Sequence, residues 1–399
     1  MVDLRQRCSY PRLVRRPECS RCRGSRAAHS ARRAASLALL AVATACSPGL
    51  RVGVVLPETG EAAAYGASIK SGIKLAFGQA VTARHAPPGL ELLFRDSGSD
   101  PTRAAGAAEG LYEAGVLAVI GGVTSAEATV MIPVAARFRR VLLSPSASAP
   151  ELARISPFFF RVYPSDELEG VEAAEFLTTT RNCRTVLILQ EDNAYTRGLL
   201  PVFARELASQ GTHLVGSLRL DEEGWDAALR RASNGKGPDG VYLCGYGDVI
   251  LAGLRALRTM GYRGTICTTS AISASSILQR AGALAEGIFF PLAGLDLADP
   301  HGPARGFVEQ YRAAYNLPPD IYAAHGYDAM EAIIAALNRL TERRGSALPA
   351  GLRALTQEQG VTGPIAFDED GNIRQHPRTY WIHNGKVEDV SNPLARPGA

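Results

Sequence analysis

Residues 51–77, RVGVVLPETGEAAAYGASIKSGIKLAF, show the pattern that decides the fold. Residues 51–56 are a short apolar run, typical of a strand that is buried on both faces of a parallel sheet. Apolar side chains then recur every four residues, at Tyr65, Ile69, Ile73 and Phe77. This spacing predicts an amphipathic helix. A buried strand followed by one amphipathic helix is the repeating unit of an α/β fold.

The same alternation continues along the chain in two series. The first series has further predicted strands at 90–96, 117–122, 140–144 and 158–163, with helices that begin at Asp100-Pro101 and at Ser125. The second has predicted helices at 166–179, 195–209, 224–233, 247–260 and 273–281, between strands at 185–190, 213–220, 240–244 and 264–269. Strands separated by single helices form parallel sheets through right-handed crossovers. We therefore expect two doubly wound α/β lobes.

The end of the chain follows a different pattern. Residues 286–292 lead through a loop at 295–303 to two predicted helices, at about 304–315 and 321–341. Asn384-Gly385, between TYWIH and KVEDV, predicts a two-residue β-hairpin. The run Asp368-Glu369-Asp370-Gly371 lacks the alternating ligands and the late Glu of a calcium loop, so we expect a plain turn there.

Residues 27–46, AAHSARRAASLALLAVATAC, predict export. Arg32 and Arg33 precede a 12-residue apolar run, Ala34–Ala45, which ends on small residues directly before Cys46. This order is typical of a lipoprotein signal that is cleaved before a lipid-modified Cys46. A short hydrophobic anchor is the alternative, although the run is well below the ~20 residues that span a bilayer. We expect residues 1–45 to be leader and signal peptide, and the remainder to be periplasmic or otherwise extracytoplasmic and lipid-anchored.

Charge and length restrict the function further. The formal net charge is +4, but residues 1–45 hold ten Arg against Asp3 and Glu18, which leaves −4 for the rest. A mildly acidic chain without basic runs is not expected to bind nucleic acid. About 350 residues follow Cys46. A single hydrophobic core stops growing at ~250–300 residues, so this length also predicts two lobes. Cys244 and Cys267 lie in or at the end of apolar runs and are expected to be buried. The alternative is one disulfide between two of the three cysteines Cys183, Cys244 and Cys267.

The sequence lacks the motifs of the common enzyme classes. No G-x-G-x-x-G follows the first strand, and neither G-x-x-x-x-G-K-[ST] nor G-x-S-x-G occurs. The histidines are scattered, and the CxxC pair Cys19 and Cys22 has no partner pair at zinc spacing. We therefore expect no cofactor, no metal and no catalysis. A hydrolase would require a base, such as His325 or His301, beside a serine.

Two segments place a serine and a helix-start pattern after a predicted strand. Thr124-x-x-Glu127 fits a capping box that opens a helix at or beside Ser125, and Ser148-x-x-Glu151 fits a second box. In doubly wound sheets, ligands bind at the carboxyl ends of the strands. Helix N-termini with a nearby hydroxyl favour an anionic group such as a carboxylate. The alternative is that both serines only cap their helices.

Three tyrosines follow predicted strands in an equivalent way. Tyr65 follows the strand at 51–56, Tyr195 the strand at 185–190, and Tyr246 the strand at 240–244. Each ring can form part of the wall of a cleft while its hydroxyl binds a polar partner.

The segments described above resemble the extracytoplasmic solute-binding proteins of ABC transporters, in their leucine/isoleucine/valine-binding branch. The resemblance covers about residues 50–390, and residues 121–153, GGVTSAEATVMIPVAARFRRVLLSPSASAPELA, are its most specific part. Further matching segments are FRDSGSDPTRA, ILQEDNAYTRGLL and IYAAHGYDAMEAI. The resemblance implies the type I periplasmic binding protein fold, two doubly wound parallel-sheet lobes joined by three crossovers. The expected N-terminal lobe is 50–164 with 293–376, and the expected C-terminal lobe is 165–292 with 377–392.

The resemblance also implies a ligand-binding site. Ser125 and Ser148 match positions whose hydroxyl binds a carboxylate, while Ser146 and Ala147 match positions that bind through the backbone. Tyr65, Tyr195 and Tyr246 match positions that line the cleft. Ser270 stands where amino-acid-binding members place a Glu that holds the ammonium group. Because a buried ammonium without a carboxylate is costly, an α-amino acid would require a substitute such as Asp248 or Asp192.

We therefore expect a lipid-anchored receptor that captures a small carboxylate-bearing or amide-like solute, an amino acid or a related compound, by hinge closure. The resemblance implies delivery of this solute to an ABC permease. The alternative is an envelope lipoprotein that senses a ligand or regulates another protein through direct contact.

Overall fold

The computed structural model describes residues 49–390 except 221, 223–224, 226, 228, 230–236, 294–303, 357 and 374. Gly49–Ala399 form one compact unit. Cys46 and the predicted leader lie outside the described residues, as do the predicted loop at 295–303 and most of the predicted helix at 224–233.

The first sheet has five parallel strands in the order β2-β1-β3-β4-β5. The strands are β1 (Arg51–Leu56), β2 (Glu91–Asp96), β3 (Ala118–Gly121), β4 (Val141–Ser144) and β5 (Phe159–Arg161). They are connected by α2 (Ala63–Thr82), α3 (Pro101–Glu113) and α4 (Ser125–Phe138). Alternate residues of β1 face opposite cores, since Val54 packs with the α2 residues and Val55 with those of α3 and α4. Helices therefore cover both faces of this sheet, as the apolar strands predict.

The second sheet has seven strands in the order β14-β13-β10-β9-β8-β6-β7. Five are parallel: β6 (Thr185–Gln190), β7 (His213–Arg219), β8 (Gly240–Cys244), β9 (Thr265–Thr268) and β10 (Phe289–Ala293). The helices of this part include α5 (Asp166–Glu175), α6 (Ala194–Ser209), α8 (Gly247–Thr259) and α9 (Ser275–Ala281). The antiparallel strands β13 (Pro377–His383) and β14 (Lys386–Asp389) complete the sheet.

The chain passes three times between the two sheets. It passes from β5 to α5, then from β10 back to α10 (Arg305–Tyr315) and α11 (Ile321–Arg339), and finally to β13. The remaining elements are α12 (Leu348–Arg353) and the short pair β11 (Glu358–Gln359) and β12 (Pro364–Ile365). Two doubly wound parallel-sheet lobes with three crossovers confirm the predicted fold class.

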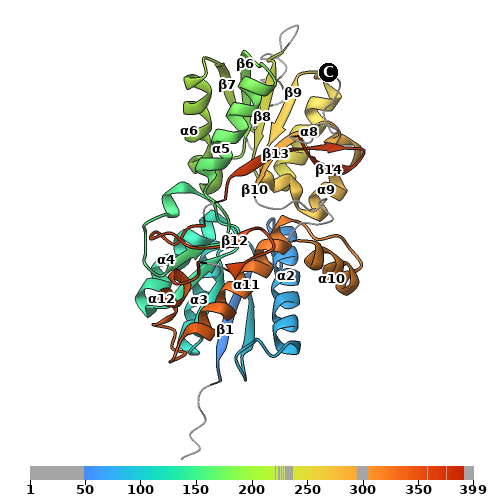
Figure 1. Ribbon diagram of the computed structural model, residues 1–399. Helices are drawn as coiled ribbons and strands as arrows, with labels where there is room; N and C mark the ends of the chain where they lie inside the picture. The colour runs from blue at the N-terminus through green and yellow to red at the C-terminus, as the bar shows by residue number, and fades with distance from the viewer. Residues whose placement is uncertain are drawn as a thin grey trace, which may run out of the picture. The chain divides into compact units, whose positions relative to one another are not determined.

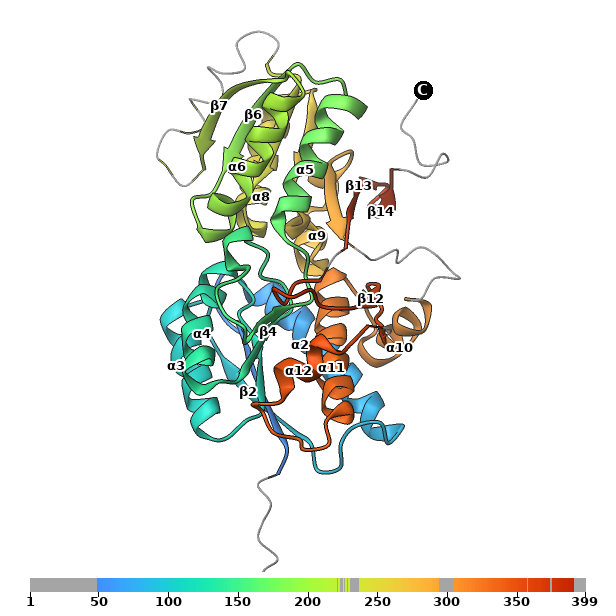
Figure 2. The same ribbon diagram turned by 60° about the vertical axis from the view of Figure 1, so that its left-hand side comes forward.

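Helices α2 and α11 lie side by side, although they are far apart in the sequence (Figures 1 and 2). A Cβ atom on Gly72 would lie 1.9 Å from the carbonyl oxygen of Ala323, and one on Gly326 would lie 2.4 Å from that of Ile69. Glycine therefore allows the two helix backbones to touch.

Two local predictions for the end of the chain are confirmed. Asn384 and Gly385 both have positive φ angles, 51° and 70°, as a type I′ hairpin turn requires. Asp368–Gly371 form a turn closed by a hydrogen bond from the Gly371 N–H to the Asp368 carbonyl (3.1 Å). Among the described residues, no group of His, Cys, Asp or Glu has the arrangement of a metal site.

The predicted capping box at Ser148 is wrong. Only a short 3₁₀ turn, η1 (Pro150–Leu152), follows this residue, its N-cap is Ala149, and no side chain caps it. The backbone is already extended at Ala153, because the chain must enter β5 a few residues later. The Ser148 hydroxyl is therefore not used as a helix cap.

Cys183, Cys244 and Cys267 are buried and free, so none of them forms a disulfide.

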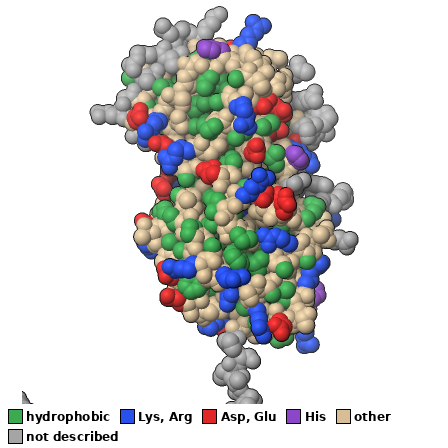
Figure 3. Space-filling model, turned by 90° about the vertical axis from the view of Figure 1, so that its left-hand side faces the viewer, with side chains coloured by type: hydrophobic (Ala, Val, Ile, Leu, Met, Phe, Trp, Pro, Cys, Tyr) green, Lys and Arg blue, Asp and Glu red, His purple; other side chains and the backbone are tan. Residues whose placement is uncertain are grey.

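On the face that Figure 3 shows, positive and negative side chains are interspersed. No helix in the described part of the chain is long and apolar enough to cross a membrane.

Candidate functional site

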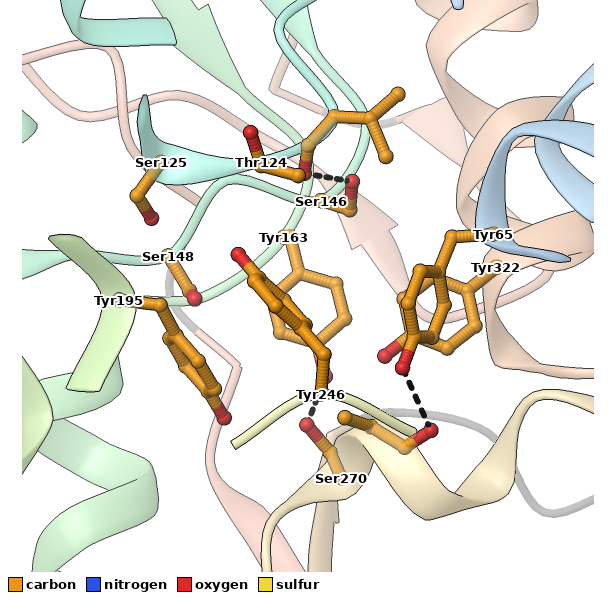
Figure 4. Close-up of a pocket in the computed structure, with 12 residues that line it drawn as sticks. Tyr65, Thr124, Ser125, Ser146, Ser148, Tyr163, Tyr195, Tyr246, Ser270 and Tyr322 are labelled. Carbon is orange, nitrogen blue, oxygen red and sulfur yellow. Dashed lines mark hydrogen bonds between the residues drawn. The ribbon is translucent and has the colours of Figure 1, made fainter. Parts of the chain in front are cut away.

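A pocket of about 380 Å³, including its open mouth, lies where the strands of both sheets end (Figure 4). Its lining side chains are all uncharged: Tyr65, Val123, Thr124, Ser125, Ser146, Ser148, Tyr163, Tyr195, Tyr246, Ser270, Ala271 and Tyr322. All predicted ligand-binding residues except Ala147 are therefore brought together in one place.

The sheet topology explains why these residues meet. In the first sheet β1 is flanked by β2 and β3, and in the second β6 is flanked by β7 and β8. At such points the connections leave toward opposite faces and open a crevice at the carboxyl ends of the strands. Ser125 follows β3 at this edge of the first sheet, and Tyr195 and Tyr246 follow β6 and β8 at that of the second.

Thr124, and not Ser125, caps helix α4. The Thr124 hydroxyl accepts from the Glu127 N–H (3.1 Å), and the Glu127 carboxylate accepts from the Thr124 N–H (3.2 Å), so the predicted capping box is present. Ser125 is the first helical residue, and its hydroxyl accepts a bond from the Ala149 N–H (3.3 Å). The Ser125 side chain thus lies in the pocket wall, beside the positive end of the helix dipole.

Ser148 lies on the loop after β4, at the same end of the pocket as Ser125 (Figure 4). Its carbonyl accepts a bond from the Asp166 N–H (2.8 Å), which fixes this loop against the start of α5. The Ser146 hydroxyl donates to the Val123 carbonyl (2.7 Å) and is committed within the protein. The Ala147 N–H donates to Ser144 Oγ (2.9 Å), and Ala147 does not line the pocket.

Five tyrosine rings form a continuous arc around the pocket. Centroid distances along the arc are 5.5 Å for Tyr195–Tyr246, 5.8 Å for Tyr246–Tyr65, 4.8 Å for Tyr65–Tyr322 and 6.4 Å for Tyr322–Tyr163. These distances are typical of favourable aromatic pairs. Burial raises the pKa of each of these hydroxyl groups, so all five are neutral near pH 7.

Tyr163 and Tyr322 were not among the predicted site residues. Tyr163 lies just beyond β5, so the rule that selects a tyrosine after a strand would have found it. Tyr322 lies in the first turn of α11, and α11 follows another helix, α10, rather than a strand. The rule therefore does not select Tyr322.

Behind the pocket wall lies a buried carboxylate that the sequence did not indicate. Glu169, on α5, accepts hydrogen bonds from the Ser270 N–H (3.0 Å), from the Ser270 hydroxyl (2.8 Å) and from the Tyr195 hydroxyl (3.2 Å). Tyr163 donates to the Ser270 hydroxyl (2.9 Å). Burial raises the pKa of Glu169, and the bonds from Ser270 and Tyr195 oppose this shift.

Neither of the two acids considered as substitutes lines the pocket. Asp248 forms an exposed ion pair with Arg280, and Asp192 forms one with Arg197.

The buried Arg161 donates to the Ala149 carbonyl (2.9 Å) and to Asn372 (2.7 Å). Its burial lowers the pKa of the guanidinium to about 10.

Of the two histidines considered as a hydrolase base, only His325 lies among the described residues. The His325 ring packs against Tyr163 in a tilted arrangement, with ring centroids 4.8 Å apart, and no hydrogen bond within the described residues joins it to Ser125 or Ser148. Burial lowers the pKa of His325 to about 3, so the ring is neutral. His301 lies outside the described residues.

A pocket at the facing strand ends of two doubly wound lobes is the arrangement of a solute-binding protein. Residues 49–384 match the model of the periplasmic binding protein family, and the chain belongs to this family. Its fold is that of the type I periplasmic binding proteins.

Similar curated proteins bind amino acids. The chain is 24% identical to the leucine-, isoleucine-, valine-, threonine- and alanine-binding protein of Pseudomonas aeruginosa, over 83% of this chain and 89% of that protein. It is 25% identical to the Leu/Ile/Val-binding protein BraC3 of Rhizobium johnstonii, over 88% of this chain and 96% of that protein.

Solved structures of similar proteins include both amino-acid and aromatic-acid complexes. The leucine binding protein LivK of Thermotoga maritima has a TM-score of 0.79 and 26% identity, over 85% of this chain and 97% of that chain. LivJ of Streptococcus pneumoniae, in complex with isoleucine, has a TM-score of 0.77 and 24% identity, over 85% and 98%. A solute binding protein of R. palustris, in complex with benzoate, has a TM-score of 0.75 and 20% identity, over 86% and 95%.

Proposed function

We propose that this protein is a lipid-anchored receptor that captures a small solute with a carboxylate or amide group and delivers it to an ABC permease. The observation that carries the proposal is the end of the pocket formed by Ser125 and Ser148. Two hydroxyl groups and the first turn of α4 meet there, in a wall without a charged side chain. Hydroxyl groups and helix N–H groups can bind an anionic or carbonyl oxygen.

Closure of two lobes over the solute supports capture and release. We assign residues 50–164 and 293–376 to one lobe, and residues 165–292 and 377–392 to the other. Tyr65, Ser125, Ser146 and Ser148 then come from the first lobe, and Tyr195, Tyr246 and Ser270 from the second. A solute held by both sets would stabilise the closed form.

The relatives support transport of amino acids or similar carboxylates. The names of the curated relatives specify leucine, isoleucine and valine, and a more distant structural relative holds benzoate. An amino acid or a related small acid is therefore the solute class that we propose for this chain.

The site is tested by binding measurements on the purified chain. We would screen amino acids, 2-hydroxy acids, small aromatic acids and amides by thermal shift, and measure affinities by calorimetry. Ser125→Ala and Ser148→Ala should each weaken binding about tenfold, the effect of one lost hydrogen bond to a charged group. Ser209→Ala, at the exposed end of α6, is the matched control. Unchanged binding by both pocket variants would exclude this site.

The anchor on Cys46 is tested separately. Cells that express the chain and its Cys46→Ala variant would be labelled with a radioactive fatty acid. Label on the parent chain alone is the expected result, and equal labelling of both chains would refute the anchor.

A further inference from the structure

We propose that Glu169 makes the Ser270 end of the pocket a hydrogen-bond acceptor, so that the solute presents an N–H or O–H donor there, opposite its carboxylate. This inference rests on the proposed function, and it names Glu169 as a positioning residue that determines specificity. The directions of the hydroxyl protons of three pocket residues determine which solute groups can bind at this end.

The contacts determine these directions one after another. The Glu169 carboxylate accepts from three donors, and one of them is the Ser270 hydroxyl, which donates its single proton to it at 2.8 Å. The Tyr163 hydroxyl, 2.9 Å from Ser270 Oγ, must then donate to that oxygen. The Tyr195 hydroxyl donates to the other carboxylate oxygen at 3.2 Å. All three protons therefore point into the protein and away from the solute.

At this end of the pocket, the solute therefore meets oxygen lone pairs. Tyr163, Tyr195 and Ser270 all line the pocket, and each hydroxyl oxygen retains acceptor capacity after donating its proton (Figure 4). The backbone N–H of Ser270 is also unavailable, because it donates to Glu169 at 3.0 Å. A solute group without a donor would leave the remaining lone pairs of these hydroxyl oxygens unpaired, which costs binding free energy.

The charge of Glu169 adds a preference among donors. Glu169 is 6% exposed, and no Lys or Arg is among its hydrogen-bond partners in the described part of the chain. A negative charge on Glu169 would stabilise a nearby positive group through Ser270 and Tyr195. An ammonium should bind better than a neutral hydroxyl, and a second carboxylate should be rejected. Ser270 has no carboxylate to hold an ammonium group. Glu169 on α5 thus supplies that carboxylate from behind Ser270.

The first experiment compares solutes that differ only in the donor. Calorimetry would use L-leucine, 2-hydroxy-4-methylpentanoate and 4-methylpentanoate, and the parallel aromatic series L-phenylalanine, 3-phenyllactate and 3-phenylpropanoate. In a series that binds, we expect the amine to bind best, the hydroxyl less well, and the donor-free acid at least tenfold more weakly than the amine. A donor-free acid that binds as tightly as its amine or hydroxyl analogue would overturn the inference.

The second experiment reverses the proton directions. In Glu169→Gln the side-chain oxygen can still accept from the Ser270 N–H, while its NH₂ group donates to Ser270 Oγ. The Ser270 hydroxyl proton then turns away from residue 169, and the ratio of amine to donor-free affinity should fall at least tenfold. Glu172→Gln, one turn along α5 and bonded to Thr379, is the matched control. A folded Glu169→Gln variant with the parent ratio would overturn the inference.

The two proposals fail in distinguishable ways. Leucinol lacks the carboxylate of leucine but keeps its amine. If leucinol and leucine bind equally well, the carboxylate site at Ser125 and Ser148 is wrong, whatever Glu169→Gln does. If leucinol binds more weakly than leucine, but the ratio of amine to donor-free affinity is the same in Glu169→Gln as in the parent chain, the receptor function stands and the role of Glu169 is wrong.

Discussion

The hydroxyl of Tyr65 accepts a 2.8 Å hydrogen bond from the backbone N–H of Gly247. Tyr65 belongs to α2, beside the first sheet, and Gly247 begins α8, beside the second. The same hydroxyl lies 3.4 Å from the carbonyl oxygen of Ala271, to which it donates. One buried side chain thus joins the first lobe to two backbone segments of the second, directly at the pocket.

Tyr65→Phe should weaken solute binding about tenfold without unfolding the protein. The change keeps the ring and leaves the Gly247 N–H without this acceptor in the closed form, a loss of about 1–3 kcal/mol. Calorimetry with a bound solute measures the effect. Tyr315→Phe is the control, because its hydroxyl donates to the Ser71 carbonyl (2.9 Å) away from the pocket. Equal effects of both substitutions would show that Tyr65 does not hold the lobes together.

Gly198→Ala should lower affinity while leaving stability unchanged or increased. Gly198 lies in α6, where a Cβ would be 2.9 Å from Pro150 Cδ and 2.7 Å from a Glu151 carboxylate oxygen. The new methyl group would separate α6 from η1, which we place in opposite lobes, and about 1 kcal/mol of closure free energy should be lost. Within a helix, alanine is otherwise preferred over glycine. Calorimetry and urea unfolding together check this, with Gly110→Ala, which meets nothing within 4 Å, as the control. An unchanged affinity would contradict the assignment.

Gly72→Ala should destabilise the protein by about 3 kcal/mol, because its Cβ would overlap the Ala323 carbonyl oxygen and force α2 away from α11. Gly78→Ala, on the same helix, meets nothing within 4 Å and should stabilise by about 1 kcal/mol. Urea unfolding of the two variants gives the comparison. Similar unfolding midpoints would contradict the close packing of these helices.

His325→Phe should make the protein less sensitive to acid. Burial lowers the pKa of His325 from 6.5 to about 3, so its neutral ring contributes stability that is fully present above pH 6.5. This contribution is lost as the pH falls from 6.5 toward 3, because only the unfolded chain takes up the proton. From pH 6.5 to pH 5 the loss is about 2 kcal/mol.

The His325→Phe effect is measured as a difference from the parent chain in urea unfolding at pH 7 and pH 5. This comparison cancels buried acids such as Asp328, whose pKa burial raises to about 6 and whose effect on stability has the opposite sign. Phenylalanine retains an aromatic ring against Tyr163. A constant difference between the two chains across this range would show that His325 titrates normally.

Part of the candidate site could be predicted because its positions follow strands, whereas Ser146 and Ser270 were indicated only by the family resemblance. Ser125, Tyr195 and Tyr246 were each selected by that rule, and all three line the pocket. The rule failed at Glu169, which lies within the first turn of α5 and acts on the site only through Ser270 and Tyr195. A residue that contacts the wall from behind leaves no pattern in the local sequence.

The sequence by itself determined what depends on near neighbours. The alternation of strands and helices, the capping box at Thr124 and the hairpin turn at Asn384-Gly385 all arise from contacts within a few residues. The tertiary structure alone decided that Ser148 starts no helix, that the Tyr322 ring packs against Tyr65, and that Glu169 bonds to a serine 101 residues away. These outcomes depend on how two sheets and their crossovers pack together, and short-range preferences contain no information about that packing.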